Sequence, residues 1–521
     1  MKKNVNIFRN FIVKYDFLLI SILILGFFIR IFQLASKSIT YDEACSICFI
    51  QKPWITIFSH RYLIRPGYFL LLKIWTGFFG YTENAIRSFS VLLGTVSIYL
   101  IYKTGKILFD RTTGIFAAFL LSISVYHVIR SQQARPYAFL MLLVLLLIYY
   151  FWKIIQRGKV GDYVLYTVIM IFAMYTHFPA AAIIFLLNNF FYIGCGYRAR
   201  SWLFSQLLIL ICGLFLIFPA SKCLEVENYS DKYCPVEYER ILPNILADFS
   251  YGRKINHGGV GDYNIIQRPF FTKIPFYLFI LLIYGASVQL ILSQKKRKIY
   301  FKKQAIFLLL WLCFPLVILM ASNFFLPISK WIKMIIISLP AFIILISICL
   351  KKISGYFRGI FIGLILCSSC VSLHYYYCIP HDSWREVAGF VKKNIEENDV
   401  VILAPIQNLA NFWYYYSDKR KSLLNLDHGY LGKVRLIDGK WQDHFWDGSN
   451  LIIGIVRENV DEIIKKDLNL ENQSKTIWLI ISPGWMYDRG KLLRYIERKY
   501  SLKEKYTFPW EGVEVFYCKP L

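Results

Sequence analysis

Apolar stretches separated by short polar loops follow one another through the first 378 residues of the chain. Stretches of this length can cross the ~30 Å hydrocarbon core of a bilayer as helices, whose backbone groups are hydrogen-bonded internally. The first is too long for a signal-peptide core and has no small-residue cleavage site behind it, so we expect a retained anchor. The pattern predicts eleven spans, at residues 17–35, 88–103, 114–129, 137–152, 163–178, 180–196, 202–219, 271–292, 305–323, 331–350 and 360–377.

The pattern changes after residue 378, where no apolar run of span length remains. Ser383 and Glu386 have the spacing of a capping box, which predicts a helix that ends near Glu397. Short apolar runs predict strands at 399–404, 433–437 and 476–481 and a helix at 491–498. The sequence therefore predicts a polytopic α-helical membrane protein (residues 1–378) with a C-terminal soluble α/β domain (residues 379–521).

Basic residues gather in alternate loops and indicate the orientation of the chain in the membrane. Loops rich in Lys and Arg are cytoplasmic by the positive-inside rule, and four basic residues before the first span place the N-terminus on that side. We therefore expect a plasma (inner) membrane protein whose segments 36–87, 220–270 and 379–521 are extracytoplasmic. The loop residues behind this orientation are Lys106, Arg111, Lys153, Arg157, Lys159, Arg198, Arg200, Lys295, Lys296, Arg297, Lys298, Lys351, Lys352 and Arg358.

Charge is distributed unevenly along the chain. The net charge is +27, yet only 13 of the 33 acidic residues precede residue 379, and two of these, Asp42 and Glu43, are adjacent just past the first span. Carboxylates are also favoured at a helix start by the helix dipole, so the pair alone is compatible with a solvated helix end. No predicted span contains Asp or Glu, which argues against a proton-coupled transporter.

Cationic and aromatic residues share the predicted outer face with the acidic pair. Segment 36–87 is neither polar nor glycine-rich, and residues 68–75 have the pattern of an amphipathic interfacial helix. Arg and Lys in such a place suit a lipid phosphate, although they also snorkel to headgroups without a catalytic role. The residues gathered on this face are His60, Arg61, Arg65, Arg87, His127, Arg130, Gln132, Gln133, Arg135, Tyr137, Tyr175, Thr176 and His177.

Most of the twelve cysteines lie within apolar spans, where a thiol behaves as a small hydrophobic group. The C-x-x-C at residues 45–48 has no second cysteine pair to accompany it. We interpret it as two neighbours on one helix face and not as a redox or metal site. Disulfides are open between Cys223 and Cys234 and, with less support, between Cys378 and Cys518.

Four motifs carry a resemblance to a known family. Together they resemble the family 39 glycosyltransferases of the GT-C superfamily, which include the protein O-mannosyltransferases and the aminoarabinose transferases of lipid A. They follow the family's order and cover nearly the whole membrane part. The motifs are Tyr41-Asp42-Glu43-Ala44, Ala85-Ile86-Arg87-Ser88-Phe89-Ser90, Ser131-Gln132-Gln133-Ala134-Arg135-Pro136-Tyr137 and Tyr175-Thr176-His177.

The resemblance implies a sugar donor carried on a polyprenyl phosphate, transfer on the outer face, and inversion at the anomeric carbon. Asp42 matches the family's first Asp, the base that deprotonates the acceptor hydroxyl, and Glu43 would orient the acceptor or a nearby cation. Cations would stabilise the leaving phosphate. The candidates are Arg65, Arg87, Arg135 and Lys333 for the donor phosphate and lipid, and His60, Tyr68, Tyr137 and His177 for the acceptor or sugar.

Two departures from the family pattern point to an altered substrate more than to an inactive enzyme. The family's His-Pro-Pro-Leu-Tyr-like run is Arg65-Pro66-Gly67-Tyr68 here, which lacks the His, although His60 could compensate. The family's Arg-Tyr before a late Leu-Pro appears as Lys333-Met334, and Lys keeps the charge without the two-pronged geometry of Arg.

Other readings remain open from the sequence. A ligase or oligosaccharyltransferase would transfer a preassembled glycan, a transporter would move a lipid or solute, and a scaffold would only display the outer domain. No nucleotide-binding loop is visible, and we expect no nucleic-acid partner. The expected partners are the donor lipid, membrane lipids and an acceptor that is a protein, a lipid A-like glycolipid or an envelope polymer. Asp42 and Glu43 could hold a divalent cation, but no second ligand set accompanies them.

Overall fold

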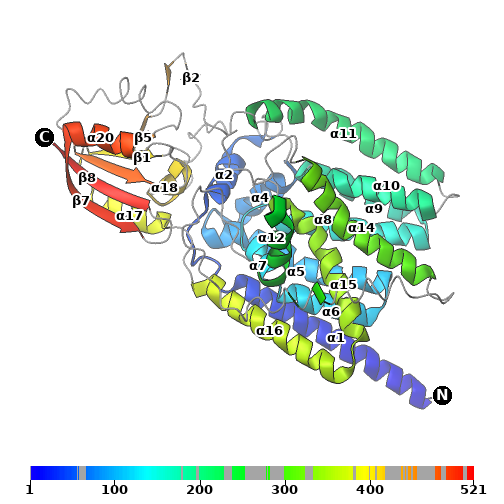
Figure 1. Cartoon of the computed structure of the whole chain (residues 1–521). Coiled ribbons are helices and arrows are strands. Elements are labelled where there is room, and N and C mark those ends of the chain that lie inside the picture. The colour runs from blue at the N-terminus through cyan, green and yellow to red at the C-terminus, as the bar shows by residue number, and fades with distance from the viewer. Residues whose placement is uncertain are drawn as a thin grey trace.

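A computed structural model shows a bundle of long helices with an α/β domain beside one end of it (Figure 1). The bundle holds the predicted membrane part and the α/β domain the C-terminal part. The structure describes residues 2–54, 57, 66–177, 180–194, 199–227, 238–252, 277, 280–281, 299–322, 332–378, 383–397, 399–404, 408–416, 436–437, 440–441, 444–447, 450–454, 476–482, 489–508 and 513–521.

Most of the long described helices of the membrane part overlap predicted spans, since an apolar segment in lipid must satisfy its backbone internally. Helices α2, α4 and α12 lie outside the predicted spans. Most of the predicted span 271–292 lies outside the described residues. The helices are α1 (Lys2–Ile31), α2 (Tyr41–Gln51), α4 (Pro66–Phe79), α5 (Glu83–Leu108), α6 (Arg111–Ser122), α7 (Val125–Ser131), α8 (Tyr137–Gln156), α9 (Val160–Thr176), α10 (Ala180–Gly194), α11 (Ala199–Glu227), α12 (Tyr238–Tyr251), α14 (Ile299–Ser322), the 3₁₀ helix η6 (Ile332–Ser338), α15 (Leu339–Lys352) and α16 (Gly355–Cys378).

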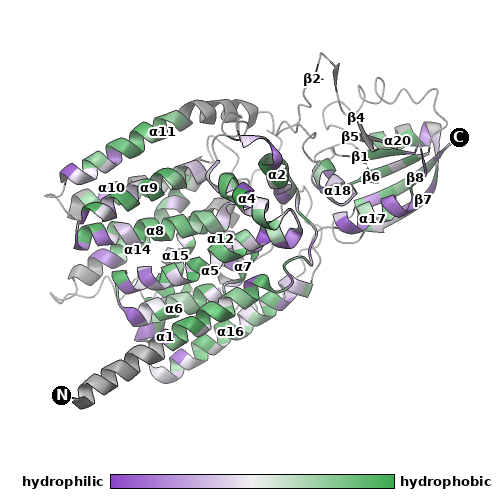
Figure 2. Ribbon diagram, turned by 180° about the vertical axis from the view of Figure 1, so that it is seen from behind, coloured by the Kyte–Doolittle hydropathy of each residue, from purple (hydrophilic) through white to green (hydrophobic). Residues whose placement is uncertain are grey.

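Apolar residues cover most of these helices, as Figure 2 shows. Among the described residues, α5, α8, α16 and the segment Ile335–Lys352 are each long and apolar enough to cross a membrane, and α6 with α7 passes the same test as a bent pair. Large apolar side chains on α1, α11 and α16 are exposed, as expected for surfaces that face lipid. The molecule is therefore a helical membrane protein, while the count of eleven spans remains a prediction.

Helix α5 joins the two ends of the bundle. Its 26 residues extend roughly 39 Å at the α-helical rise, from Glu83 beside the α/β domain to Leu108. At the Leu108 end, Asp110 pairs with Lys351 and the Gln156 amide donates to the Ile107 carbonyl at 3.3 Å. Loops that the charge pattern assigns to the cytoplasm thus lie at the opposite end of α5 from the acidic pair.

The predicted third span, residues 114–129, is a broken helix and not a single one. Helices α6 and α7 meet at an angle of 64°, and Ser124 caps the second of them at the N-terminus. The break leaves the last carbonyl groups of α6 without helical partners. The buried Arg30 of α1 takes the place of these partners: its guanidinium donates hydrogen bonds to Leu121 O at 2.9 Å and to Ser122 O at 3.0 Å.

The C-terminal part contains a six-stranded mixed sheet in the order β4-β5-β1-β6-β8-β7. Strands β5, β1 and β6 are parallel, and β4, β8 and β7 are added antiparallel. A two-stranded ladder, β2 with β3, stands apart from it. The elements are α17 (Trp384–Asn394), β1 (Val400–Ala404), α18 (Leu409–Tyr416), β2 (Leu436–Ile437), β3 (Lys440–Trp441), β4 (His444–Asp447), β5 (Asn450–Gly454), β6 (Ile477–Ile481), α20 (Arg489–Lys499), β7 (Tyr500–Phe508) and β8 (Val513–Pro520).

The two faces of this sheet bury different side chains. Strand β1 is buried throughout, as a central parallel strand must be. Its Val401 and Leu403 join one apolar core with α17 and α18, whereas Val400 and Ile402 join a second core with α20. The first core also contains Ile39 and other residues around α2, so this face of the sheet docks on the membrane part.

Several local predictions for the C-terminal part need correction. The helix after Ser383 forms, but the capping box is wrong: Ser383 has φ −96° and ψ 14°, and its hydroxyl makes no capping hydrogen bond. Cys378 and Cys518 are both free thiols, so they form no disulfide. Cys234 lies outside the described residues, and its pairing with Cys223 stays a prediction. The sequence did not predict strands β3, β4, β5, β7 and β8 or helix α18. The charged Lys-Glu-Lys run in β7 is typical of an edge strand, which lacks the apolar pattern of a buried one.

Candidate active site

The acidic pair lies in the first turn of α2, and the two carboxylates face different surroundings. Thr40 is the N-cap, with its hydroxyl accepting from Glu43 N–H at 3.3 Å. The Glu43 carboxylate in return accepts the Thr40 N–H at 3.1 Å, which completes a capping box. Local sequence thus fixes Glu43 toward the helix start and leaves Asp42 on a different side of the turn.

Glu43 is buried and ion-paired with Arg87 of α5. Its side chain is 1% exposed, and the Arg87 guanidinium meets it with two parallel hydrogen bonds, Nε to Oε1 at 2.8 Å and Nη2 to Oε2 at 2.9 Å. The amide N–H of Ala134, in the loop between α7 and α8, donates to Oε1 at 3.0 Å. Glu43 therefore connects α2, α5 and this loop.

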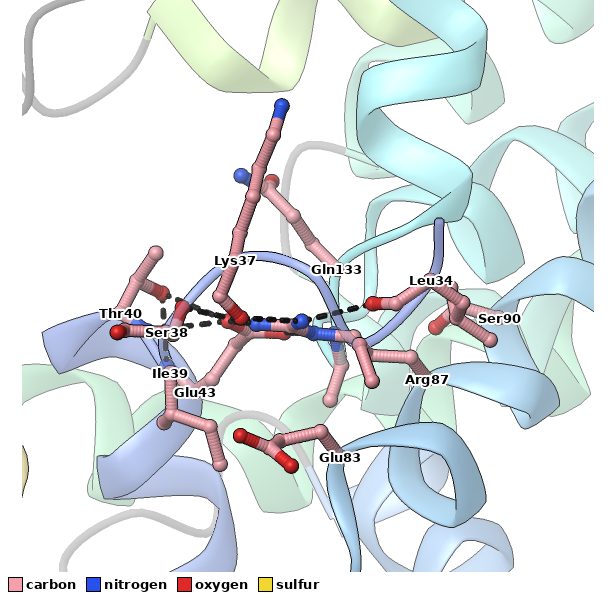
Figure 3. A network of polar contacts seen from close by, with 12 residues as sticks. Leu34, Lys37, Ser38, Ile39, Thr40, Glu43, Glu83, Arg87, Ser90 and Gln133 are labelled. Carbon is pink, nitrogen blue, oxygen red and sulfur yellow. Dashed lines mark hydrogen bonds and ion pairs between the residues drawn. The ribbon is translucent and has the colours of Figure 1, made fainter. Parts of the chain in front are cut away.

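Arg87 has every N–H engaged within the protein, as Figure 3 shows. Besides Glu43, it donates to the carbonyl oxygens of Leu34 at 2.8 Å, Lys37 at 2.9 Å and Ser38 at 3.0 Å. A guanidinium has five N–H groups, and these five contacts use all of them. Arg87 keeps no donor for a ligand, so we assign it to positioning segment 32–40 between α1 and α2 and not to the donor phosphate.

The surroundings of Glu43 keep it ionised. Burial raises the pKa of its carboxyl, but the charge and hydrogen bonds of Arg87, together with the N–H groups of Ala134 and Thr40, outweigh that effect and hold the pKa below its ordinary value of 4.5. A buried carboxylate whose oxygens already accept these hydrogen bonds is a poor general base, because an acceptor hydroxyl cannot reach them.

Asp42 is the accessible member of the pair. Its side chain is 21% exposed, and its Oδ1 lies 3.7 Å from Nη2 of Arg135. Arg135 is itself buried and is oriented by two further contacts of its Nη1, with Asp42 O at 2.9 Å and Ser46 Oγ at 3.2 Å. The structure thus brings together a partly exposed carboxylate and a fixed guanidinium, the two groups that the resemblance assigns to the base and the leaving phosphate.

Helices α4 and α9 place Tyr68 and His177 in the same part of the bundle. Gly67 packs so closely on α9 that a Cβ there would lie 2.6 Å from Thr176 Oγ1. This contact accounts for the glycine in the Arg65-Pro66-Gly67-Tyr68 run, which differs from the family pattern. Tyr68 is fully buried with its hydroxyl 3.0 Å from Ser90 Oγ, and the buried His177 is the C-cap of α9.

Tyr137 belongs to a buried aromatic and cationic cluster at the start of α8. The Arg130 guanidinium lies 5.1 Å from the Tyr137 ring centroid and 5.2 Å from that of Tyr126. Asp248 of α12, also buried, acts on the same Arg130 through its charge. Sequence reasoning missed Asp248, because it lies in a predicted outer loop more than a hundred residues away with no motif around it.

Arg30 is the second residue that sequence reasoning missed. It is fully buried in α1, and its Nη2 contacts Nδ1 of His127 at 2.7 Å in addition to the α6 carbonyls. The only sequence signal was a lone Arg near the end of an apolar span, a position that usually snorkels. His127 is thereby part of the α6–α7 break and not of the surroundings of Asp42.

Several predicted site residues lie beyond what the structure describes. His60, Arg61 and Arg65 are outside the described residues, and for Lys333 the structure describes the backbone in η6 but not the side chain. Their assignments remain proposals. Within the described parts of the chain, no group of three or more His, Cys, Asp or Glu is arranged to hold a metal ion.

The C-x-x-C beside the pair is composed of free thiols. Burial raises the pKa of Cys45 to about 12 and that of Cys48 further. Cys48 contributes to the apolar core shared with the C-terminal domain. Because the thiolate is the reactive form, these thiols are suited to packing and not to redox chemistry.

Comparison with known proteins gives a family match over part of the chain and a fold for the whole of it. Residues 65–223 match the family model described as dolichyl-phosphate-mannose-protein mannosyltransferase. ArnT from Cupriavidus metallidurans in the apo state has a TM-score of 0.56 at 11% identity, over 97% of this chain and 98% of ArnT. The same protein bound to undecaprenyl phosphate has a TM-score of 0.52 at 10% identity, over 98% of both chains.

A more distant likeness is to the oligosaccharyltransferase of Archaeoglobus fulgidus, with a TM-score of 0.48 at 11% identity over 77% of this chain. The chain spans 63% of the length of that enzyme. No curated protein sequence matches the chain. The family match over residues 65–223 and the fold shared with ArnT agree with the resemblance that the four motifs predicted, and the chain has the fold of ArnT.

Proposed function

We propose that this protein transfers a sugar from a polyprenyl-phosphate donor to an acceptor hydroxyl on the extracytoplasmic face of the plasma membrane, with inversion. The observation that carries the proposal is the pairing of the partly exposed Asp42 carboxylate with the buried Arg135 guanidinium, 3.7 Å apart, in a chain with the ArnT fold. That ArnT binds undecaprenyl phosphate supports a lipid-borne donor here.

The chemistry assigns one task to each group. The acceptor oxygen attacks the anomeric carbon, the bond from that carbon to the phosphate oxygen breaks, and Asp42 takes the acceptor proton. Negative charge builds on the departing polyprenyl phosphate, where Arg135 stabilises it, with Arg65 and Lys333 as further candidates. Glu43 and Arg87 hold Asp42 in place and touch neither substrate.

Sugar and acceptor contacts are assigned to the residues around this pair. His177 caps α9 and Tyr68 lies on the neighbouring α4, and Tyr137 begins α8 two residues after Arg135. His60 is a candidate of the same kind from segment 36–87. The C-terminal domain is proposed to be extracytoplasmic, since it lies at the end of α5 opposite the basic loops.

A transfer assay tests the proposal. Membranes or proteoliposomes containing the protein are supplied with labelled polyprenyl-phosphate sugars, and consumption is compared between wild type and Asp42→Asn. We expect kcat to fall by about 10²- to 10⁴-fold in the variant, with the donor KM nearly unchanged, because only proton removal is lost. Asp110→Asn is the matched control: Asp110 caps α6 at the opposite end of α5, and Asn caps as well as Asp.

The outcomes separate the alternatives. Full turnover by Asp42→Asn would show that another group is the base. No consumption of any polyprenyl-linked sugar would overturn the transferase itself, and consumption of a preassembled glycan alone would assign the protein to the ligases.

A further inference from the structure

The segment that leads into the acidic pair is held from two sides. Residues 32–40 connect α1 to α2, and their carbonyl groups are bound by two different arginines. Arg87 binds the carbonyls of Leu34, Lys37 and Ser38 from within the membrane part. The intervening carbonyls are bound from the C-terminal domain, which reaches the same segment from the other side.

Arg385 and Tyr415 make these opposing contacts. Arg385 Nη2 donates to Ala35 O at 2.8 Å and Nη1 to Ser36 O at 3.4 Å, while its backbone N–H donates to Ser38 Oγ at 3.3 Å. The hydroxyl of Tyr415 accepts the Ile39 N–H at 2.6 Å. Segment 32–40 is therefore fixed by a helix that belongs to the bundle and by two residues that follow it by more than 340 positions.

Glu83 joins the two systems. It lies one helical turn before Arg87 on α5, and its Oε1 accepts Arg385 Nη2 at 2.6 Å and the Tyr415 hydroxyl at 2.8 Å. The Arg385 guanidinium also lies 5.6 Å from the Tyr415 ring centroid. Burial lowers the pKa of Arg385, but its hydrogen bond and charge interaction with Glu83 outweigh this and raise it, so the guanidinium stays charged.

An apolar contact surrounds these polar ones. Ile39, Ala44 and Ile47 from the α2 region are buried in one core with residues of α18, among them Phe412 and Trp413. Figures 1 and 2 show α18 beside α2 from opposite directions. Such a contact has little freedom to slide, since packed side chains of both domains fill it.

We propose that Glu83, Arg385 and Tyr415 form an interdomain clamp through which the C-terminal domain positions Asp42 for glycosyl transfer. The inference rests on the proposed function of Asp42. These three are positioning residues that touch no substrate. They fix the backbone as far as Ile39, three residues before Asp42, and a displacement of about 1 Å of a reacting group is enough to lower turnover by about 100-fold. The C-terminal domain thus helps to position the catalytic residue in the membrane part.

Kinetics of conservative variants test the clamp. Tyr415→Phe keeps the ring and removes the hydroxyl that joins Ile39 to Glu83, and Glu83→Gln weakens the same junction if Tyr415→Phe fails to fold. Each should lower kcat by about 10- to 100-fold with the donor KM within about 3-fold of wild type. Tyr414→Phe is the matched control, because Tyr414 is the neighbouring residue on α18 and donates to Tyr81 O at 2.8 Å, outside segment 32–40.

Hydrogen exchange provides a readout that needs no catalysis. In the purified full-length protein, amide exchange of a peptide covering residues 34–46 should accelerate in Tyr415→Phe and Glu83→Gln and stay at the wild-type rate in Tyr414→Phe. Wild-type kcat in Tyr415→Phe, equal loss in Tyr414→Phe, or unchanged exchange in both clamp variants would overturn the proposal. If wild type consumes no donor, the proposed function fails, and exchange still decides whether the clamp holds the segment.

Discussion

Asp42 and Glu43 are adjacent acids in one helical turn, yet their surroundings have little in common. Around Glu43 the protein is closed: the carboxylate is 1% exposed and is bound by Arg87, Ala134 and Thr40. Around Asp42 it is open: the carboxylate is 21% exposed, with Arg135 at 3.7 Å. The same chemical group is thus a buried structural anion in one place and a partly accessible carboxylate in the other.

The difference shows how fixing one carboxylate of an adjacent pair can leave the other accessible. A buried bidentate pair is costly to form from solvated ions but very rigid once every N–H and oxygen is satisfied. Glu43 and Arg87 therefore define the backbone from which Asp42 projects. Changes at the two positions should separate stability from turnover, and the following predictions test that separation.

Glu43→Gln should produce the largest loss of stability. The amide leaves the Arg87 charge buried without a counter-ion and brings an N–H group against other donors, which costs about 3–5 kcal/mol. Asp42→Asn should change stability by only about 0–1 kcal/mol, because its pair is partly exposed. Thermal unfolding of both variants in the same detergent measures the contrast; equal destabilisation would show that the two surroundings are not distinct.

Arg87→Lys should have a smaller but clear effect. Lysine keeps the charge but cannot serve Glu43 and three carbonyls at once, so loss of charge-assisted hydrogen bonds should cost about 1.5–3 kcal/mol. Arg111→Lys is the control, since its partner Asp16 is 58% exposed and such surface pairs contribute about 0–1 kcal/mol. The measurement compares the thermal unfolding midpoints of the two variants with that of wild type, and similar shifts in both would contradict the positioning role of Arg87.

Gly67→Ala should disturb the Asp42 side without breaking a hydrogen bond of Glu43. The added Cβ meets Thr176 Oγ1 at 2.6 Å, an overpacking that typically costs about 1–3 kcal/mol. Gly77→Ala on the same helix has nothing within 4 Å and should be neutral or slightly stabilising. Unfolding of the two alanine variants is compared directly; a neutral Gly67→Ala would mean that α4 and α9 move apart easily beside His177.

The smallest expected effect is the loss of folding stability at acid pH that comes from protonation of Glu43. A lowered folded-state pKa means that the ionised carboxylate stabilises the fold, fully above 4.5 and progressively less as pH falls below it toward the folded pKa. Between about pH 6 and pH 4, only the beginning of this loss is expected. Wild type should lose more stability over that range than Glu43→Gln, which lacks the titrating group. Parallel losses would assign the acid sensitivity to other carboxyls.

Much of the fold could be predicted because its cause is local. A run such as residues 137–152 is apolar all round, so it forms a buried or lipid-facing helix wherever it lies, and α8 covers it. The α6–α7 break could not be predicted in this way. It depends on Arg30, 91 and 92 residues away from the carbonyls that it binds, and no local pattern records that contact.

The candidate site also contains residues that could be predicted from local sequence motifs and others whose roles depend on distant contacts. The motifs contained Asp42, Arg135 and His177, because a family pattern preserves residue types in sequence order. The role of Arg87 could not be deduced from the motifs. The resemblance assigned it to the donor phosphate, and only the structure shows that its five N–H groups are bound to Glu43 and three carbonyls. The clamp was likewise invisible, since Tyr415 and Glu83 are separated by 332 residues.

By itself, the sequence determined that this is a membrane protein with an acidic pair at the start of a helix and a compositionally distinct C-terminal domain. Hydrophobicity, net charge and capping act over a few residues, so they can be read along the chain. Only the tertiary structure decided which acid is buried, which arginine is saturated and which domain holds segment 32–40. Burial and hydrogen bonding depend on which distant groups meet in space, and that is set by the packing of the whole chain.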